Sequence, residues 1–543
     1  MRLSSIFTPI CICVGVVSRV LAVTTNGTNM VYGFDSIPTS PDLQWVPCFD
    51  DFTCANLEVP IDYEDPTLGT TSIAFIKLRG ENATDDAQSI LINPGGPGGS
   101  GVDMLLTYRA NAGPIFGSQY NAISFDPRGV NNSGLVFDCF AGNSAAKTAL
   151  VRLHTPGRVN ASTESIINQY YSATILGEWC DVAVRENSPY GYYVTTPAVV
   201  RDMITFIEAE AESIGKPKAD AKLWFYGLSY GTIIGTTFAS QFPDRVGRMI
   251  LDGVVDVEQY YTNTWRDNVV QDDEMVNSFA KFCYQAGPNN CLFWGPSAEN
   301  ITNRLDRIML QLEQEPIPLS GLDTGKLPTL VTVSDLKGYI LSAGYEPLVY
   351  FPLLADTLVN VERGNVSTLA GVVESFGQFP DADNIIRCAD TYTRNKLVTL
   401  DAYREYVEFT TSKSRYVGDI YPTSNDIVTC RGFHHNLPDS MTFQGPLPPT
   451  SNGTAFPILF ASNTIDPITP IVGARKMAEG FPGSVVLTQE AVGHTVANQG
   501  GSPCYFNYLH AYLAGTMPPP HVTCPIDRVP FIDGGVMAVV EGT

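Results

Sequence analysis

The chain has 543 residues, of which 44% are hydrophobic and 16% are charged. This composition is typical of a folded globular protein and excludes intrinsic disorder and a membrane-embedded body. The formal net charge of −23 is spread along the sequence, which argues against nucleic acid and anionic membrane surfaces as partners. The length suits one large catalytic domain with a substantial insertion, or two domains.

The N-terminus has the pattern of a secretory signal peptide. Arg2 precedes an apolar stretch from Ile6 to Val17, and small residues follow up to Ala22. The apolar stretch is too short for a membrane anchor, and no second stretch of about 18 apolar residues follows. We therefore expect residues 1–22 to be removed and the mature chain to be extracellular, with no membrane anchor.

Cysteine usage and glycosylation sequons agree with export. Cys11 and Cys13 lie in the expected signal peptide, which leaves ten of the twelve cysteines, an even number suited to an oxidising compartment. Their spacing suggests pairing between neighbours, as a hypothesis: Cys48 with Cys54, Cys139 with Cys180, Cys283 with Cys291, Cys388 with Cys430, and Cys504 with Cys524. Seven Asn-x-Ser/Thr sequons stand at Asn26, Asn82, Asn131, Asn160, Asn300, Asn365 and Asn452. No CxxC pair or zinc-like histidine spacing is present, so we expect no metal site.

Short apolar segments alternate with helical patterns, which predicts a parallel α/β sheet. The expected strands are Ile73 to Leu78, Ser89 to Asn93, Ala122 to Phe125, Leu223 to Tyr226, Met249 to Leu251, Ile458 to Ala461 and Val485 to Leu487. A helix is expected from Thr196, with that residue as N-cap and Pro197 at the first helical position.

After Asp252 the alternation of strands and helices stops for roughly two hundred residues. The expected elements there are helices at Asn268 to Gln285, Ala298 to Glu313, Val333 to Ser342 and Leu348 to Glu362. Because strands lie on both sides of this segment, we interpret it as a helical lid inserted into one α/β domain. The expected divisions are the core at residues 23–255 and 451–543, and the lid at 256–450.

The pentad GLSYG, from Gly227 to Gly231, lies between an expected strand and a helix-like segment. Such a turn, called a nucleophile elbow, exposes a serine in a strained conformation at the top of a sheet. The context makes Ser229 the candidate nucleophile.

A serine hydroxyl needs a base, and the base needs an acid that orients it. His494 follows the last expected strand, where the chain order serine, acid, histidine places the base. Asp466 follows the strand Ile458 to Ala461 and is the favoured acid. Asp252 is the rival acid, although support for the start of the lid is the preferred interpretation of it.

Two backbone N–H groups are expected to stabilise the oxyanion. One belongs to Tyr230, directly after the nucleophile, and the other comes from the glycine-rich segment PGGPGGSG after an early strand. Pro97 has no N–H, which leaves Gly96 as the preferred second donor. A phosphate-binding loop is disfavoured because the segment lacks the Gly-Lys-Ser/Thr ending.

Several motifs together resemble the secreted tripeptidyl aminopeptidase and prolyl aminopeptidase group of α/β-hydrolases, the serine peptidase family S33. They are PGGPGGSG, SFDPRGVNNSG, GLSYG, ILDGVVD, SNTIDPITP and VGHTV. The resemblance runs from about Cys48 to Cys524 and implies an α/β-hydrolase fold with a mostly parallel central sheet and an inserted helical lid. It also implies Ser229, Asp466 and His494 as catalytic triad. Pro94 stands where the prolyl enzymes carry a histidine.

These features predict a cofactor-free serine hydrolase, most simply an exopeptidase that releases short peptides or single residues from free N-termini. A secreted carboxylesterase or lactonase on small esters, and a catalytically silent relative that binds a protein partner, are the alternatives. An aminopeptidase needs a carboxylate for the substrate ammonium. The acids in or near the lid are Asp256, Glu258, Glu346 and Glu408, and the sequence does not choose among them.

Overall fold

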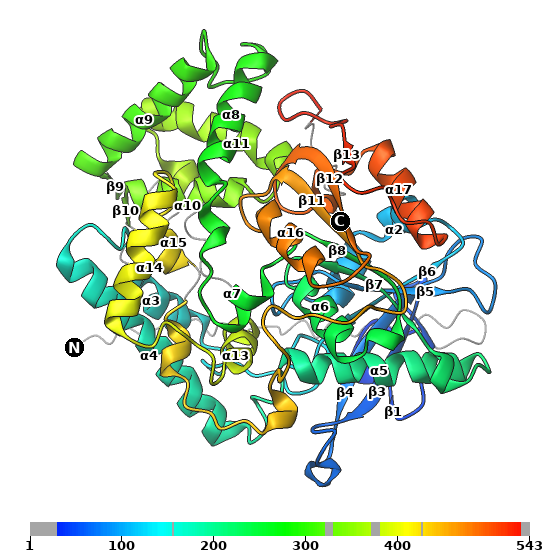
Figure 1. Cartoon of the computed structure of the whole chain (residues 1–543). Helices are drawn as coiled ribbons and strands as arrows, with labels where there is room; N and C mark the ends of the chain where they lie inside the picture. The colour runs from blue at the N-terminus through cyan, green and yellow to red at the C-terminus, as the bar shows by residue number, and fades with distance from the viewer. Residues whose placement is uncertain (1–29, 155–156, 321–328, 371–380, 425–426, 534–543) are drawn as a thin grey trace, which may run out of the picture.

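The computed structural model describes residues 30–154, 157–320, 329–370, 381–424 and 427–533. An 11-stranded sheet runs through its centre in the order β1-β3-β4-β6-β5-β7-β8-β11-β12-β13, with β2 paired to β3 (Figure 1). The strands are β1 (Thr39–Ser40), β2 (Val46–Cys48), β3 (Phe52–Pro60), β4 (Thr70–Leu78), β5 (Ser89–Asn93), β6 (Asn121–Asp126), β7 (Leu223–Leu228), β8 (Val246–Asp252), β11 (Leu459–Ile465), β12 (Val485–Val492) and β13 (Thr523–Cys524). The expected signal peptide lies outside the described residues.

The sheet is parallel from β6 to β13 and antiparallel where β2, β3, β4 and β6 pair. All five residues of β5 and all six of β6 are buried. Strands buried on both faces need uninterrupted runs of hydrophobic or small residues, which is why these segments could be recognised in the sequence. This is the α/β-hydrolase arrangement that the sequence motifs implied.

Helices cover both faces of the sheet, and neighbouring strand residues point to opposite faces. Phe225 packs in one core with α5 (Thr196–Ser213), α6 (Gly231–Gln241) and α16 (Ile471–Glu479). Tyr226, the next residue of β7, packs in the other core with α1 (Gly101–Thr107) and α17 (Pro503–Leu513). A short helix, α2 (Ala112–Phe116), also lies beside α17 (Figure 1).

The start of α5 differs from the sequence prediction. Thr196 is the first residue of the helix, Thr195 is its N-cap, and the N-cap side chain makes no capping hydrogen bond. The hydroxyl of Thr196 instead bonds to Tyr230 and to the carboxylate of Asp390. The expectation of Thr196 as N-cap was therefore wrong, because long-range partners take the oxygen that a local cap would use.

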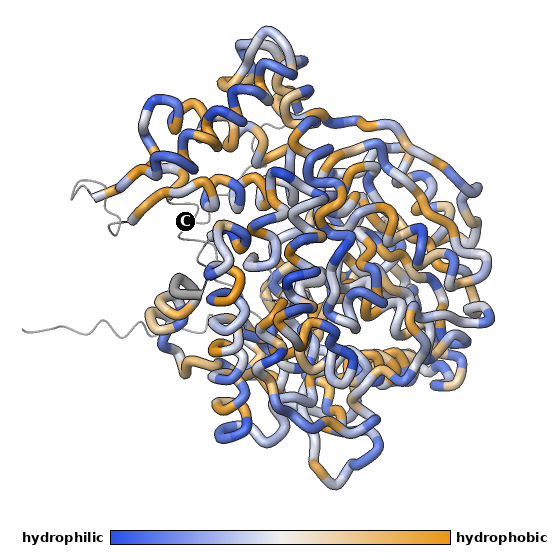
Figure 2. Tube along the Cα trace, turned by 60° about the vertical axis from the view of Figure 1, so that its left-hand side comes forward, coloured by the Kyte–Doolittle hydropathy of each residue, from blue (hydrophilic) through white to orange (hydrophobic). Residues whose placement is uncertain are grey.

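A long helical segment separates β8 from β11 in the sequence, and we call residues 253–458 the helical insertion. Its described helices are α7 (Val257–Tyr261), α8 (Asp272–Ala286), α9 (Ala298–Gln314), α10 (Val333–Ala343), α11 (Pro347–Glu362), α13 (Asp381–Asp390), α14 (Leu400–Lys413) and α15 (Tyr421–Ser424). A two-stranded sheet of β9 (Ile317–Leu319) and β10 (Thr329–Val331) accompanies them. Hydrophobic and hydrophilic residues alternate along these helices (Figure 2). The buried hydrophobic residues of α8, α9, α10, α11 and α14 share a core of their own, whereas those of α7 and α13 belong to the core that contains Phe225.

The connection between β6 and α5 also carries two helices, α3 (Ser144–His154) and α4 (Thr163–Asn187), which the sequence did not predict. Tyr170 and Ala173 of α4 belong to the core of the insertion. The insertion is therefore packed against a helix from the first half of the chain. Among all described helices, none has the length and the apolar composition that crossing a membrane requires.

Five disulfides close within the chain, and they join the neighbouring cysteines that the sequence suggested. The pairs are Cys48–Cys54, Cys139–Cys180, Cys283–Cys291, Cys388–Cys430 and Cys504–Cys524. The pairing hypothesis is thus confirmed. Of the seven sequons, Asn26 lies outside the described residues, Asn300 is partly buried and the other five asparagines are exposed.

Candidate active site

Ser229 stands at the turn between β7 and α6. Its φ of 54° lies in the left-handed region, where a residue with a side chain is strained. The Ser229 N–H donates to the carbonyl of Asp252 at 2.9 Å, and the N–H and hydroxyl of Thr232 donate to the Ser229 carbonyl. These bonds hold the strained turn and fix the direction in which the serine side chain leaves the backbone.

Two close backbone approaches explain glycines around this turn. A Cβ on Gly227 would lie 2.4 Å from the carbonyl oxygen of Gly231. A Cβ on Gly95 would lie 2.4 Å from the carbonyl oxygen of Leu228 and 2.9 Å from the nitrogen of Tyr230, and the φ of Gly95 is 97°. The glycine-rich loop after β5 therefore lies directly against the elbow, as an oxyanion-binding loop requires.

The backbone N–H groups of this loop are not equivalent. The N–H of Gly95 donates to the side chain of Asn93 at 3.0 Å and is thus occupied. Within the described part of the chain, the N–H groups of Gly96 and Tyr230 have no hydrogen-bond partner. Both N–H groups that the sequence suggested as donors are therefore free to bind an oxyanion.

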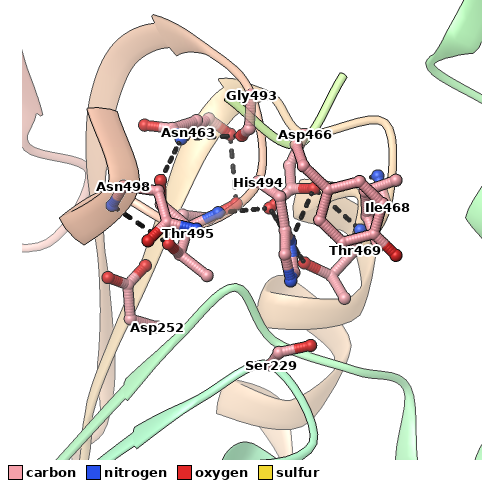
Figure 3. Close-up of polar contacts among 12 residues, drawn as sticks. Ser229, Asp252, Asn463, Asp466, Ile468, Thr469, Gly493, His494, Thr495 and Asn498 are labelled. Atoms are coloured by element: carbon pink, nitrogen blue, oxygen red, sulfur yellow. Dashed lines mark hydrogen bonds and ion pairs between the residues drawn. The ribbon is translucent and has the colours of Figure 1, made fainter. Parts of the chain in front are cut away.

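His494 and Asp466 lie side by side at the ends of β12 and β11 (Figure 3). Nδ1 of His494 is 3.2 Å from both carboxylate oxygens of Asp466 and 3.1 Å from the hydroxyl of Thr469. Asp466 also accepts bonds from the N–H groups of Ile468, Thr469 and Thr495 at 2.8 to 3.1 Å. Both His494 and Asp466 are buried. The carboxylate is thus fixed in place and fixes the imidazole in turn.

The loop that carries His494 is fastened at several points. The His494 N–H donates to the carbonyls of Gly344 and Tyr345 in the helical insertion, at 3.2 and 3.1 Å. The side-chain amide of Asn463 donates to the carbonyls of Gly493 and Thr495, both at 2.8 Å. The core and the insertion therefore position the histidine together.

Figure 3 shows the His494 ring pointing toward Ser229 from above. The Ser229 hydroxyl makes no hydrogen bond to any described residue, and its side chain is only partly buried. Hydrogen bonds between nucleophile and base are often long in unliganded enzymes and tighten when substrate binds. The structure brings all three predicted triad residues to the carboxyl edge of the parallel strands.

Asp252, the rival acid, has a different position. Its carboxylate accepts bonds from the N–H groups of Val496 and Ala497 at 2.7 and 3.0 Å and from the hydroxyl of Tyr226 at 2.8 Å. Burial raises its pKa to about 6. The preferred interpretation, support for the start of the lid, was therefore wrong, because Asp252 holds the segment after His494 instead.

Tyr345 packs beside His494. Its ring packs edge-on against the imidazole with centroids 5.3 Å apart. The residue keeps 43% of its surface exposed, yet burial raises the pKa of its hydroxyl to about 12, with the charges of Asp466, Asp383 and Asp272 adding to the shift. From this combination of exposure and depth we infer a space above the triad that the Tyr345 ring borders, and we call it the recess.

Asp390, a buried residue of the helical insertion, is connected by hydrogen bonds through Thr196 to Tyr230, the residue after the nucleophile. Asp390, at the end of α13, accepts bonds from the Thr196 N–H at 2.8 Å, the Thr196 hydroxyl at 2.6 Å and the Tyr260 hydroxyl at 2.8 Å. The Thr196 hydroxyl is also 2.6 Å from the hydroxyl of Tyr230. Since Thr196 has one hydroxyl proton and gives it to Asp390, Tyr230 must donate to Thr196.

Sequence reasoning missed this chain of hydrogen bonds and missed Thr469. For Thr469 a signal existed, because the residue is part of the motif SNTIDPITP. Asp390 carries no local signal, since its partners are 130 and 194 residues away. Burial raises the pKa of Asp390 to about 7.

Several known proteins are similar to this chain over most of its length. Residues 423–524 match the family described as TAP-like protein. Over 511 residues the chain is 27% identical to Serine protease Hip1 of Mycobacterium tuberculosis, which covers 89% of this chain and 91% of that protein. The chain is a serine hydrolase with the α/β-hydrolase fold. The hydrolase is also 24% identical over 509 residues to the tripeptidyl aminopeptidase of Streptomyces lividans, with 90% and 87% of the two chains covered. To Carboxylesterase B of Mycobacterium tuberculosis it is 23% identical over 492 residues, with 87% and 86% covered.

The four acids that the sequence put forward for an ammonium site have separate environments in the hydrolase. Asp256 and Glu258 both pair with Lys476, at 2.7 and 2.8 Å. Glu408 is exposed, and Glu346 is partly buried at the start of α11. Of the four, only Glu346 adjoins Tyr345 and the recess.

One group of described residues has the composition of a metal site. Cys139, Cys180 and Asp381 bring two sulfurs and a carboxylate within 4.8 Å of one another. The two sulfurs form a disulfide, so neither is available as a thiolate ligand. The Asp381 carboxylate accepts a bond from the Cys139 N–H at 2.8 Å and pairs with Lys147 at 2.7 Å. These contacts give the cluster a structural explanation.

Proposed function

We propose that the hydrolase is a secreted exopeptidase that releases short peptides or single residues from free N-termini through an acyl-enzyme. The observation that carries this proposal is the pairing of a serine hydrolase site with near full-length similarity to a tripeptidyl aminopeptidase and a serine protease. The five disulfides suit an oxidising compartment and support the extracellular location.

In the proposed mechanism Ser229 attacks the scissile carbonyl while His494 takes the hydroxyl proton. Because Nδ1 of His494 faces Asp466, the other ring nitrogen is the one that serves as base. The N–H groups of Gly96 and Tyr230 stabilise the oxyanion. His494 then protonates the leaving amine, and water hydrolyses the acyl-enzyme by the same route. No step needs a cofactor.

Thr469 supports the orientation of the base in this scheme. Its hydroxyl donates to Asp466 at 2.8 Å and lies 3.1 Å from Nδ1 of His494. It therefore bridges acid and base.

Hydrolysis of small esters is a second candidate function. The similarity to Carboxylesterase B favours it, and the same triad and oxyanion donors would serve both reactions. The two functions differ in what the recess selects: a peptide with a charged N-terminus, or an uncharged acyl group. Binding of a protein partner without catalysis is the remaining alternative, and a protein of that kind would not react with a serine-directed probe.

Matched chromogenic substrates test these functions. Purified protein is given single aminoacyl, tripeptidyl, N-blocked tripeptidyl and simple acyl substrates, each repeated with Ser229→Ala. We expect cleavage of the free-amino peptides, little cleavage of the blocked ones, and none with the variant. Ester cleavage without peptide turnover would replace the peptidase by the esterase. Failure of a fluorophosphonate to label Ser229 would refute both enzymes.

A further inference from the structure

The first turn of α13 lies against the oxyanion loop. A Cβ placed on Gly98 would be 3.1 Å from the backbone nitrogen of Asp383 and 3.4 Å from the Cβ of Ala382. The charge of Asp383 also contributes to the raised pKa values of Tyr230 and Tyr345, after burial and nearer carboxylates. Asp383 therefore belongs to the helix turn that contacts the loop carrying Gly96 and Gly98.

The carboxylate of Asp383 is accessible and weakly paired. Within the described part of the chain it makes one ion pair, with Arg387 at 3.6 Å, which is longer than a hydrogen bond. Its side chain keeps 19% of its surface exposed. Burial nonetheless raises its pKa, while the charges of Arg387 and Lys147 lower it. Asp383 is thus mostly buried and still partly accessible to solvent.

Helix α13 is held firmly at both ends, so this carboxylate has a fixed position. At the start, Asp381 bonds to the Cys139 N–H and pairs with Lys147. At the end, Cys388 forms a disulfide with Cys430, and Asp390 accepts three hydrogen bonds. A binding group needs this kind of rigid support, because a loose carboxylate would lose entropy on every binding event.

The other acids near the recess are less suited to contact a substrate. Asp256 and Glu258 are neutralised by Lys476. Both carboxylate oxygens of Asp272 are sealed from solvent and have no hydrogen-bond partner among the described residues. Glu346 is the remaining rival, since it adjoins Tyr345.

We propose that Asp383 binds the α-ammonium group of the substrate and thereby selects a free N-terminus. This inference rests on the proposed exopeptidase function. An ammonium group brings three N–H donors and a positive charge, and the carboxylate of Asp383 has acceptor positions that no described residue fills. At a carboxylate that is mostly buried the ion pair is screened less than at the surface, so a substrate without the charge binds much more weakly.

The position of Asp383 also limits the length of the acyl part. Gly96 and Gly98 are two residues apart and span at most about 7 Å, so the carboxylate is on the order of 10 Å from the oxyanion donors. Extended peptides rise by about 3.3–3.6 Å per residue. The ammonium should therefore precede the scissile bond by roughly one to three residues.

The experiment compares kcat/KM for tripeptidyl p-nitroanilides with free and acetylated N-termini. The variants are Asp383→Asn, Glu258→Gln as matched control, and the rivals Glu346→Gln and Asp272→Asn. For Asp383→Asn we expect kcat/KM on the free substrate to fall about 10- to 100-fold, with a far smaller change on the acetylated one. The control Glu258→Gln removes a carboxylate that pairs with Lys476 and should leave the ratio of the two rates unchanged. Fluorophosphonate labelling of Ser229, which needs no ammonium, should keep its rate in Asp383→Asn.

Each result decides one question. If the native protein cleaves both substrates equally well, the proposed exopeptidase function is wrong and the assignment of Asp383 falls with it. If the native protein prefers the free substrate and Asp383→Asn keeps that preference, the exopeptidase stands and the assignment is overturned. A selective loss in Glu346→Gln or Asp272→Asn alone, or an equal loss on both substrates in Asp383→Asn, overturns it too.

Discussion

Replacement of Thr196 by valine should disturb catalysis from a distance. Valine has nearly the shape of threonine but lacks the hydroxyl that joins Tyr230 to Asp390. In the variant the buried Tyr230 hydroxyl loses its acceptor and Asp390 keeps two of its three donors. The N–H of Tyr230 is one of the two proposed oxyanion donors, so a loosened Tyr230 side chain should reduce kcat.

The size of the effect follows from the bonds removed. One buried donor left without a partner costs about 1–3 kcal/mol, and the second lost hydrogen bond costs about 1 kcal/mol. We therefore expect Thr196→Val to lose about 2–4 kcal/mol of stability. Loss of an oxyanion donor costs a hundredfold or more in kcat, and displacement of one should cost less, roughly tenfold.

The assay measures Tm by differential scanning fluorimetry, and kcat and KM with a chromogenic ester. Thr237→Val is the matched control, because Thr237 is also buried in the core and its hydroxyl bonds at 3.0 Å to Tyr261 of the insertion. Both variants should lower Tm, and only Thr196→Val should lower kcat. Equal kcat in the two variants would refute the coupling between Asp390 and the oxyanion donor.

Three further predictions concern pH, a disulfide and a glycine. Burial raises the pKa of Asp252 to about 6, so the folded state binds a proton that the unfolded state releases near pH 4. This group therefore lowers the free energy of unfolding by about 3 kcal/mol as pH rises from about 4 to 6. Across that interval the Tm of Asp252→Asn should rise relative to the Tm of the native protein. A difference between the two Tm values that stays constant with pH would contradict this. The disulfide Cys388–Cys430 joins residues that are 42 positions apart, so its removal should lower the free energy of unfolding by about 4 kcal/mol and lower the Tm measured by calorimetry. An unchanged Tm would contradict this prediction. Gly95→Ala should abolish most fluorophosphonate labelling of Ser229 because its Cβ meets the Leu228 carbonyl at 2.4 Å, and full labelling would show that the loop can move aside.

The central strands could be predicted from sequence because burial on both faces leaves an uninterrupted apolar pattern. All seven expected strands exist, although Met249 to Leu251 is only the middle of β8. The antiparallel strand β3 was missed, since it has polar residues among its buried ones and a proline at its end. A strand near the edge of a sheet needs no continuous apolar run, so its pattern is weaker.

Some helices of the insertion were predicted from the sequence and others were not. The four expected helices correspond to α8, α9, α10 and α11, and α9 begins at Ala298 as expected. Helices α13 and α14 were not predicted. Helix α13 is short and includes three buried charged residues, Asp381, Arg387 and Asp390, and the partly buried Asp383. From the sequence alone, this polar pattern predicts a surface loop, because the residues that bury its charges are distant in the sequence.

The candidate site was predictable where chain order and strand ends determine it. Parallel strands present their carboxyl ends at one edge, so residues that follow β7, β11 and β12 must lie together. The supporting residues were not predictable, because Asp390 and Thr196 meet only when the insertion packs on the core. For the same reason the helix-capping pattern wrongly predicted Thr196 as the N-cap of α5.

The pairing of neighbouring cysteines has a consequence for biosynthesis. Every disulfide from Cys48 to Cys524 closes before the next pair in the sequence begins. When the chain is exported with its N-terminus first, the two cysteines of each pair appear before those of the next pair. Each pair can therefore be oxidised before a competing thiol arrives. No disulfide has to wait for the far end of the chain, so the thiols need no isomerase to sort them. The addition of β11 beside β8 joins strands on either side of the helical insertion, and this docking unites Ser229 with Asp466 and His494.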